Sequence, residues 1–310
     1  MKRRKPQLYP TRHLRSVFEV LLKIQDFVFG KQENRKNQVE SQIPVSVLIP
    51  IHPKDLWIGR YSVKYLKKNL LHPISEILIV SPYDEEIKEW CREEGLEWLD
   101  ESESVDWTLE QLGERLPEWA QNRKGWLFQQ LIKLSADKLC KEEHILVLDA
   151  DTLLVKERSF IVNGEVSLDY SHERNLLYLK SYRHLIGEAP SSWVSFVTHY
   201  MFMEKTILTQ LKERIQSHCG ASWDEAIVAL GSDEIWTTRE NEVYPFNFFS
   251  EYEIYGNFSK KVHGRVKSKY FRNFSVSGFD EKKIDVDLIA EQLPSFYYWA
   301  SFHSYNSSQD

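Results

Sequence analysis

Two aspartates, Asp149 and Asp151, stand two positions apart in HILVLDADTLLV, directly after an apolar run. Side chains two positions apart on an extended backbone point to the same side, so the two carboxylates can converge on one divalent cation. Oxygen ligands suit Mg²⁺ or Mn²⁺, and such an ion can hold a diphosphate and neutralise its charge as it leaves. The pair therefore predicts a metal site for a phosphorylated ligand, with two solvated loop acids as the alternative.

The elements that must position this pair alternate along the first half of the chain. The expected strands are 44–51, 75–81 and 144–149, and the expected helices between them are 55–71, 84–94 and 124–140. Near-continuous apolar strands are typical of a sheet interior, and strands that alternate with helices predict a parallel sheet with helices on both faces. Ligands of such sheets bind beyond the carboxyl ends of the strands, which is where the two aspartates lie.

The second half of the chain has a different pattern. Short alternating runs within 160–183, SLDYSH and LLYLKSY, predict antiparallel strands. Helices are expected at 204–218 and 222–230, whereas the aromatic and polar chain from residue 244 onward shows no clear repeat.

Charge is distributed unevenly between the start of the chain and the remainder. Residues 1–43 contain ten Lys or Arg and four acidic residues, whereas the whole chain has a net charge of −6. Apolar residues within this basic segment recur at helical spacing, at Leu14, Val17, Phe18, Leu21, Ile24 and Val28. They predict an amphipathic helix that either packs on this protein or a twin subunit, or rests on an anionic membrane surface.

We expect two parts, a basic segment with its linker at 1–43 and one α/β domain at 44–310. Glu19, Lys23 and Asp26 interrupt the apolar stretch of the first part, so neither a signal peptide nor a membrane span is predicted. Three widely separated cysteines suggest a reducing compartment. We therefore expect a cytoplasmic protein, either free or peripheral on the inner face of the plasma membrane. The acidic body argues against nucleic-acid binding.

A phosphatase or a nucleotidyltransferase could use the same two acids. Phosphatases of the haloacid-dehalogenase type usually carry Thr or Val two positions after the second Asp, where this chain has Leu153. Their motif also tends to lie on the first strand of the domain, whereas two strands are expected before this one. The phosphate-binding patterns GxxxxGK[ST] and GxGxxG are absent. A non-catalytic sugar-binding or scaffold protein, with structural aspartates, is the third alternative.

Five segments in this order resemble those of a bacterial family of proposed glycosyltransferases that is known as a domain of unknown function. They are GWLFQQLIKL (125–134), ILVLDADTLLV (145–155), SFVTHYMFMEK (195–205), FFSEYEIYGNF (248–258) and FHSY (302–305). The resemblance covers about residues 45–305. More distantly, the pattern is similar to the GT-A class of nucleotide-sugar transferases.

This resemblance implies a GT-A-like (Rossmann-like) α/β fold, in which helices flank a mixed, mainly parallel central sheet. It also implies that Mn²⁺ or Mg²⁺ assists the transfer of a sugar from a nucleotide-sugar donor. The implied acceptor is a saccharide of a bacterial surface glycan, such as capsule or lipopolysaccharide, or its lipid-linked precursor.

The resemblance also implies roles for single residues. Asp149 and Asp151 match the metal and diphosphate motif, and His303 matches a late histidine that completes the metal shell in several GT-A enzymes. A surface histidine near the end of the chain is the alternative for His303. Asp55 follows the first strand, where such folds hold the nucleotide base or ribose, and a helix N-cap is an equally good interpretation of it.

On the expected helix at 124–140, Gln129 and Gln130 lie four and three positions before Lys133 and share a face with it. Because this face leads to the DxD strand, we expect it to bind the donor sugar or phosphate, with a solvated Lys133 as the alternative. His199 is flanked by apolar residues. Acceptor contact fits the family, although a buried structural histidine is the more common case.

Inverting glycosyl transfer needs a general base for the acceptor hydroxyl. The segment SEYEIYG offers Glu251 and Glu253, and its aromatic neighbours would raise the pKa of a carboxylate toward a useful range. Glu251 is the first choice, with Asp233 and Glu234 in reserve. We expect an inverting enzyme; in a retaining one, Glu251 would position the acceptor instead.

Overall fold

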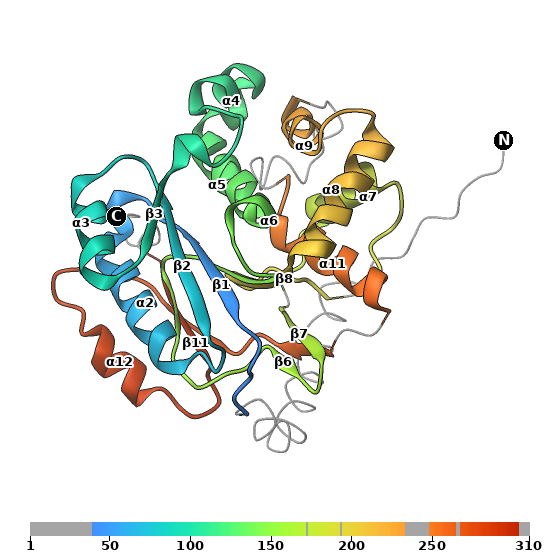
Figure 1. Cartoon of the computed structure of the whole chain (residues 1–310). Coiled ribbons are helices and arrows are strands. Elements are labelled where there is room, and N and C mark those ends of the chain that lie inside the picture. Colours follow the sequence, from blue (N-terminus) through green and yellow to red (C-terminus); the bar gives the residue numbers. More distant parts are fainter. Residues whose placement is uncertain (1–38, 172, 193, 233–247, 265–266, 304–310) are drawn as a thin grey trace.

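The computed structural model of the protein describes residues 39–171, 173–192, 194–232, 248–264 and 267–303 (Figure 1). The amphipathic helix expected in the first 28 residues lies outside these ranges, as do the reserve acids Asp233 and Glu234. The division at residue 43 stays a prediction.

A five-stranded sheet forms the centre of the protein, with strand order β3-β2-β1-β4-β8. Its strands are β1 (Val45–Pro50), β2 (Ile74–Ser81), β3 (Glu97–Asp100), β4 (His144–Leu148) and β8 (Tyr200–Glu204). The first four are mutually parallel, and β8 runs antiparallel to β4. The predicted fold class, an α/β protein with a mixed and mainly parallel sheet, is confirmed.

Helices cover both faces of this sheet, because the central strands are apolar on both faces. On β1, Leu48 belongs to one buried cluster, while Val47 and Ile49 belong to another. The Val47 side packs against α2 (Leu56–Asn69) and α3 (Glu85–Glu94) (Figure 1). Helices that contribute to the Leu48 cluster are α4 (Leu109–Arg115), α5 (Lys124–Leu134), α7 (Leu176–Ile186), α8 (Lys205–Cys219), α9 (Trp223–Ser232) and α11 (Glu251–His263).

Two small sheets extend the fold beyond β4. One has the order β10-β11-β5, with β5 (Thr152–Leu154), β10 (Asn273–Val276) and β11 (Trp299–Phe302). The other has the order β6-β7-β9, with β6 (Ile161–Val162), β7 (Glu165–Tyr170) and β9 (Lys267–Tyr270). A third buried cluster joins the first small sheet to α2 and to α12 (Val286–Gln292). The pairing of β11 with β5 brings the end of the chain beside the residues after Asp149.

Short helical pieces complete the described chain. They are η1 (Pro53–Asp55), η2 (Glu101–Glu103), η3 (Glu118–Arg123) and α6 (Ala136–Leu139). The helix expected at 124–140 is therefore two helices, α5 and α6, which meet at Ser135.

Two sequence-based assignments need correction. LLYLKSY, expected to be a strand, lies in α7, where Asn175 caps the helix and the buried residues Leu177, Ser181 and Leu185 recur every four positions. This spacing is helical, and local alternation concealed it. The segment after residue 244, which showed no repeat, contains α11, whose first nine residues are all buried. The buried positions include the polar residues Glu251, Glu253 and Asn257, so burial did not show as an apolar stripe in the sequence.

His72 supplies a pH-dependent contact in the core. Its Nε2 accepts a hydrogen bond from the Phe160 amide at 2.9 Å, so the neutral ring carries its proton on Nδ1, 3.1 Å from the Ile43 carbonyl. Burial lowers the pKa of His72 below its ordinary value. As the pH falls below about 6.5, His72 becomes protonated in the unfolded chain but stays neutral in the folded protein. The free energy of unfolding therefore falls by up to about 1.4 kcal/mol per pH unit.

Urea unfolding at pH 7.5 and 5.5 tests this expectation. The wild-type protein should lose more unfolding free energy on acidification than His72→Gln, whose amide does not titrate. His184→Gln, a change at an exposed histidine, should behave as the wild type does. Equal losses in wild type and His72→Gln would show that His72 is charged in the folded protein.

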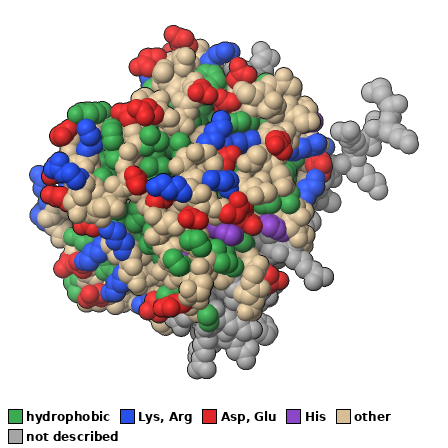
Figure 2. Space-filling model, viewed as in Figure 1, with side chains coloured by type: hydrophobic (Ala, Val, Ile, Leu, Met, Phe, Trp, Pro, Cys, Tyr) green, Lys and Arg blue, Asp and Glu red, His purple; other side chains and the backbone are tan. Residues whose placement is uncertain are grey.

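Within the described ranges, no helix is both long and apolar enough to cross a bilayer. Lysine and arginine side chains are interspersed with acidic ones over the described part of the face in Figure 2.

Candidate active site

A cavity of about 430 Å³ opens at the carboxyl ends of β1 and β4. Apart from the reserve acids, ten residues were proposed above for metal, donor, acceptor or catalysis, and nine of them line this cavity: Asp55, Gln129, Gln130, Lys133, Asp149, Asp151, His199, Glu251 and His303. They come from segments up to 248 positions apart, between Asp55 and His303. Glu253 does not line it.

Lys133 is the centre of the charged cluster in this cavity. Its Nζ lies 2.5 Å from Asp149 Oδ1 and 2.8 Å from Glu251 Oε1, and only 9% of its side chain is exposed. Burial disfavours the ammonium form, but the two carboxylates raise the pKa of Lys133 above its ordinary value. Lys133 is thus neither solvated nor directed mainly to a ligand, because its ammonium group forms ion pairs with both Asp149 and Glu251.

Lys133 acts to lower the pKa of both Asp149 and Glu251, but the net shifts have opposite signs. Burial raises the pKa of both, but at Asp149 the interactions with Lys133 and His199 together outweigh it, and the pKa lies below its ordinary value. At Glu251, burial and the nearby Asp149 prevail over Lys133, so the pKa is raised. The hydroxyl of Tyr252 also donates to Asp149 Oδ1, at 2.7 Å. Asp149 therefore stays ionised, whereas Glu251 is the carboxyl group of the cluster that is more readily protonated.

Asp151 and His303 form a second pair in the cavity. His303 Nδ1 lies 3.1 Å from Asp151 Oδ2, and the Phe302 amide donates to the Asp151 carbonyl at 2.9 Å. β11 ends at Phe302, so its pairing with β5 places His303 on the acidic pair. His303 is buried, which excludes the alternative of a surface histidine.

Asp55 follows β1 and lines the same cavity as the acidic pair. It occupies the N-cap position of α2 without making a side-chain capping bond, so the structure gives no capping role to its carboxylate. Burial raises its pKa, Lys54 opposes the shift, and the charge of Asp151 adds to it. Asp55 is thus a further carboxylate of the cavity, electrostatically coupled to Asp151.

His199 precedes β8 in a left-handed backbone conformation, with φ of 57°. Such a conformation is uncommon outside glycine and persists where surrounding contacts impose it. Its carbonyl accepts from the Asp149 amide at 3.0 Å, and its Nδ1 lies 3.6 Å from Asp149 Oδ2. Burial lowers its pKa, but Asp149 outweighs this effect and the pKa is raised. The ring centroid lies 5.0 Å from that of His303.

The two glutamines of α5 have different surroundings. Gln130 is buried, and its Oε1 accepts from the Glu251 amide at 3.2 Å, which fixes the first turn of α11 against α5. Gln129 lines the cavity and is partly exposed. Of the two, only Gln129 is well placed to meet a ligand.

Glu253, offered by the sequence as a candidate general base, is buried in a hydrogen-bond network with Ser195, Phe196 and Asn257. The reason lies in helix geometry, because residues two positions apart on a helix point in nearly opposite directions. Glu251 and Glu253, neighbours in the sequence, therefore cannot both face the cavity.

Sequence reasoning assigned no site role to four lining residues of some size: Trp126, Glu173, Tyr178 and Tyr252. Helical spacing does connect Trp126 with Gln130 and Lys133, so the face proposed for α5 could have been extended toward its start. Tyr178 could not be assigned to the site because LLYLKSY was read as a strand.

The predicted three-ligand metal set is assembled only in part. No group of three or more His, Cys, Asp or Glu side chains is arranged to hold a metal within the residues that the structure describes. Asp151 and His303 meet, whereas Lys133 and Tyr252 both donate to one oxygen of Asp149. The protein thus offers two adjoining donors, and a cation there would need further ligands from a substrate or from water.

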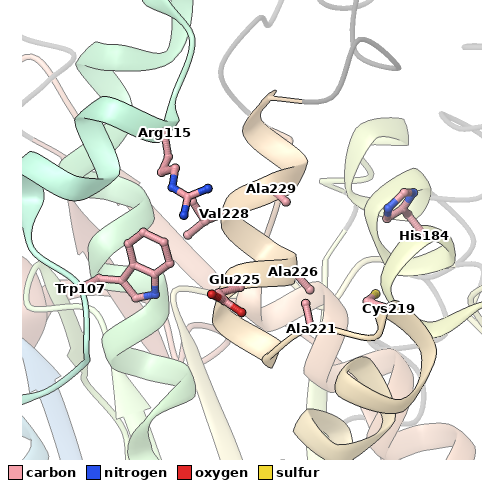
Figure 3. A pocket seen from close by; sticks show the side chains of 9 residues that line it. All are labelled: Trp107, Arg115, His184, Cys219, Ala221, Glu225, Ala226, Val228 and Ala229. Atoms are coloured by element: carbon pink, nitrogen blue, oxygen red, sulfur yellow. The ribbon is translucent and has the colours of Figure 1, made fainter.

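A second cavity, of about 340 Å³, lies around α9, with Trp107 and Arg115 on one side of that helix and His184 and Cys219 on the other (Figure 3). None of the residues predicted for the site lines it. Its alanines (Ala221, Ala226 and Ala229) and its single carboxylate, Glu225, give it a different chemical character.

A family profile described as "Family of unknown function (DUF6492)" matches residues 61–309, which include the acidic pair, Lys133, Glu251 and His303. The chain belongs to this family. Among curated proteins, none matches the chain significantly.

Solved structures of glycosyltransferases are similar to the chain at low identity. The galactosyltransferase LgtC, in complex with donor and acceptor sugar analogues, is 11% identical, with 84% of this chain and 87% of that chain covered and a TM-score of 0.39. The apo form of the glycosyltransferase GlyE from Streptococcus pneumoniae TIGR4 is 11% identical, with 85% and 55% covered and a TM-score of 0.38. At these scores the structural similarity supports no statement about the reaction of this protein. Such a statement has to rest on the residues of the site.

Proposed function

We propose that this protein is a glycosyltransferase that moves a sugar from a nucleotide-sugar donor to a saccharide acceptor. The observation that carries the proposal is one cavity at the carboxyl ends of β1 and β4, in which Asp151 meets His303 while Lys133 joins Asp149 to Glu251. Such a cavity combines a place for a diphosphate with a carboxylate suited to an acceptor hydroxyl.

Charge supports a divalent cation as part of the donor site. Five carboxylates line the cavity: Asp55, Asp149, Asp151, Glu173 and Glu251. Lys133, the cation at their centre, is already committed to two of them. The five carboxylates outnumber the two basic side chains of the lining, Lys133 and Arg123, so a bound cation would reduce the repulsion between this surface and a diphosphate. Asp151 and His303 would hold Mn²⁺ or Mg²⁺, which would offset the charge of the diphosphate leaving group.

The chain's own residues divide the remaining tasks. Lys133 keeps Asp149 ionised and orients Glu251, and Gln130 fixes the backbone of Glu251. Glu251, with its raised pKa, is the general base in an inverting reaction and takes the proton of the acceptor hydroxyl. Gln129 is a donor contact and His199 an acceptor contact. The resemblance stated above further suggests a bacterial surface glycan, or its lipid-linked precursor, as the acceptor.

Isothermal titration with UDP, GDP and CMP, each with and without Mn²⁺, tests the donor site. We expect one of these nucleotides to bind in a Mn²⁺-dependent way. Absence of binding by all three would contradict the proposal. Release of free phosphate or pyrophosphate from nucleotide sugars, without sugar transfer, would indicate the phosphatase or nucleotidyltransferase chemistry instead.

The change Asp151→Asn should weaken Mn²⁺-dependent nucleotide binding by about tenfold to a hundredfold, because the amide contributes no charge to a cation beside His303. Titration at fixed Mn²⁺ measures this loss. The matched control is Glu173→Gln, which removes the same charge from the same cavity and should keep the Mn²⁺ dependence. An equal loss in both variants would show a general charge effect and no cation site at Asp151.

A further inference from the structure

The helix α11 has contacts on two sides that bear on the cavity. Glu251 and Tyr252 line the cavity from its first turn. Glu253 follows at roughly 200° around the helix axis and points away from them. It is buried, and it is directed at the 194–199 segment, the chain that leads into β8.

Three donors converge on the carboxylate of Glu253. The Ser195 hydroxyl donates to its Oε2 at 2.7 Å, and the Phe196 amide donates to the same oxygen at 2.9 Å. The side-chain amide of Asn257, one turn along α11, donates to its Oε1 at 2.9 Å. The oxygen atoms of Glu253 are thus used to attach the 194–199 segment to α11.

Further contacts hold the same two pieces together. A Cβ added at Gly256 would lie 2.3 Å from Cγ of Phe196, so the helix backbone and this ring are in direct contact. Asn257 accepts a hydrogen bond from the Ser192 amide at 3.1 Å. The Ser195 hydroxyl oxygen in turn accepts from the Val197 amide at 3.2 Å, so the bond to Glu253 is connected directly to the backbone beyond it.

The 194–199 segment carries two residues of the cavity, Val197 and His199. His199 is the residue with the left-handed backbone, and it lies beside Asp149 and His303. A backbone in this conformation depends on neighbouring contacts to hold it. The attachment to Glu253 meets this backbone at Ser195 and Phe196, which lie four and three positions before His199.

We propose that Glu253 is a positioning residue: by binding Ser195 and Phe196 it sets the position of His199 beside Asp149 in the cavity. α11 then holds both walls, one directly through Glu251 and Tyr252 and one through Glu253. The inference rests on the proposed function only where sugar transfer is measured, since the attachment itself is a property of the protein alone.

An amide at position 253 is a sharp probe of this role. Three donors meet two carboxylate oxygens, whereas glutamine would present one oxygen and one NH₂ group to them. At least one donor would then face another donor in a buried place. Glu253→Gln preserves the size of the side chain, so the packing around it changes little.

Hydrogen exchange by mass spectrometry, followed on peptides that cover 194–199, tests the attachment. In Glu253→Gln we expect exchange of this segment to accelerate at least tenfold, while α8 stays as protected as in the wild type. Glu251→Gln should leave the segment unchanged. Glu188→Gln, at a surface carboxylate that pairs with Lys261, is the second control. Unchanged exchange in Glu253→Gln would overturn the proposal.

Kinetics separate positioning from a general structural effect. If His199 is misplaced, kcat/KM for the acceptor should fall by about tenfold to a hundredfold, whereas KM for the donor should change by less than about threefold. Equal losses for donor and acceptor would overturn the positioning role. If no sugar transfer is detected in the wild type, the proposed function fails, and the exchange experiment still decides the role of Glu253.

Ser195→Ala decides the matter if Glu253→Gln does not fold. It removes one hydroxyl and keeps both the carboxylate and the Phe196 amide, so it is the milder change. We expect faster exchange of the segment and the same split between acceptor and donor. Ser191→Ala is its control, because that hydroxyl bonds to the Asn257 carbonyl and not to Glu253. Identical behaviour of the two alanine variants would contradict the proposal.

Discussion

Replacing Lys133 with methionine should lower the free energy of unfolding by about 3–5 kcal/mol near pH 7.5, because two carboxylates lose the cation between them. Glu251 is only 4% exposed and Asp149 24%, so water cannot replace the ammonium group fully. Sugar transfer should be lost as well, since Lys133 orients Glu251 and keeps Asp149 ionised. Urea unfolding and a transfer assay measure the two effects.

The loss of unfolding free energy in Lys133→Met, relative to the wild type, should depend on pH. Without Lys133, the pKa of Glu251 rises further above its unfolded value, so the folded variant binds more protons than the unfolded chain. Its stability then falls as the pH rises. We therefore expect a smaller deficit relative to the wild type at pH 5 than at pH 8. A deficit that grows toward pH 5 would contradict the ionic role.

Lys212→Met is a matched control for this variant. Lys212 is likewise 9% exposed, and it pairs with Asp137, a carboxylate that does not line the cavity. Its removal should also cost stability, yet transfer per folded molecule should stay near that of the wild type. Loss of transfer in both variants would mean that destabilisation alone accounts for the effect at Lys133.

Replacing Glu251 with glutamine should reduce kcat by about 10²–10⁴-fold, the usual contribution of a general base. Donor binding should change little, because the pair of Lys133 with Asp149 remains. The same variant should lose the acid limb of the pH profile. In the wild type, transfer should decline as the pH falls through the raised pKa of Glu251, since the protonated acid cannot accept the acceptor's proton.

The anomeric configuration of the product, read by NMR, completes this test. Inversion together with the loss of kcat supports Glu251 as the base. Retention would assign Glu251 to acceptor positioning, the role expected of it in a retaining enzyme. If Glu251→Gln keeps more than about a tenth of the wild-type kcat, neither role is correct.

The sequence by itself determined the elements around the acidic pair. Apolar runs and turn residues define β1, β2 and β4 to within a residue or two, and the position of Asp149 after an apolar strand predicted the edge of the sheet where the cavity lies. The family resemblance added His303, and the pairing of β11 with β5 explains why so late a residue reaches the acidic pair.

Only the tertiary structure decided which charges meet. Lys133 was expected to face a donor, but the crossing of α5 and α11 brings it between Asp149 and Glu251 instead. The sequence offered both Glu251 and Glu253, with Glu251 as the first choice, and only the structure shows that α11 turns one toward the cavity and the other toward Ser195. The physical reason is that periodicity defines local structure, whereas the partner of a buried charge depends on how elements far apart in the chain pack together.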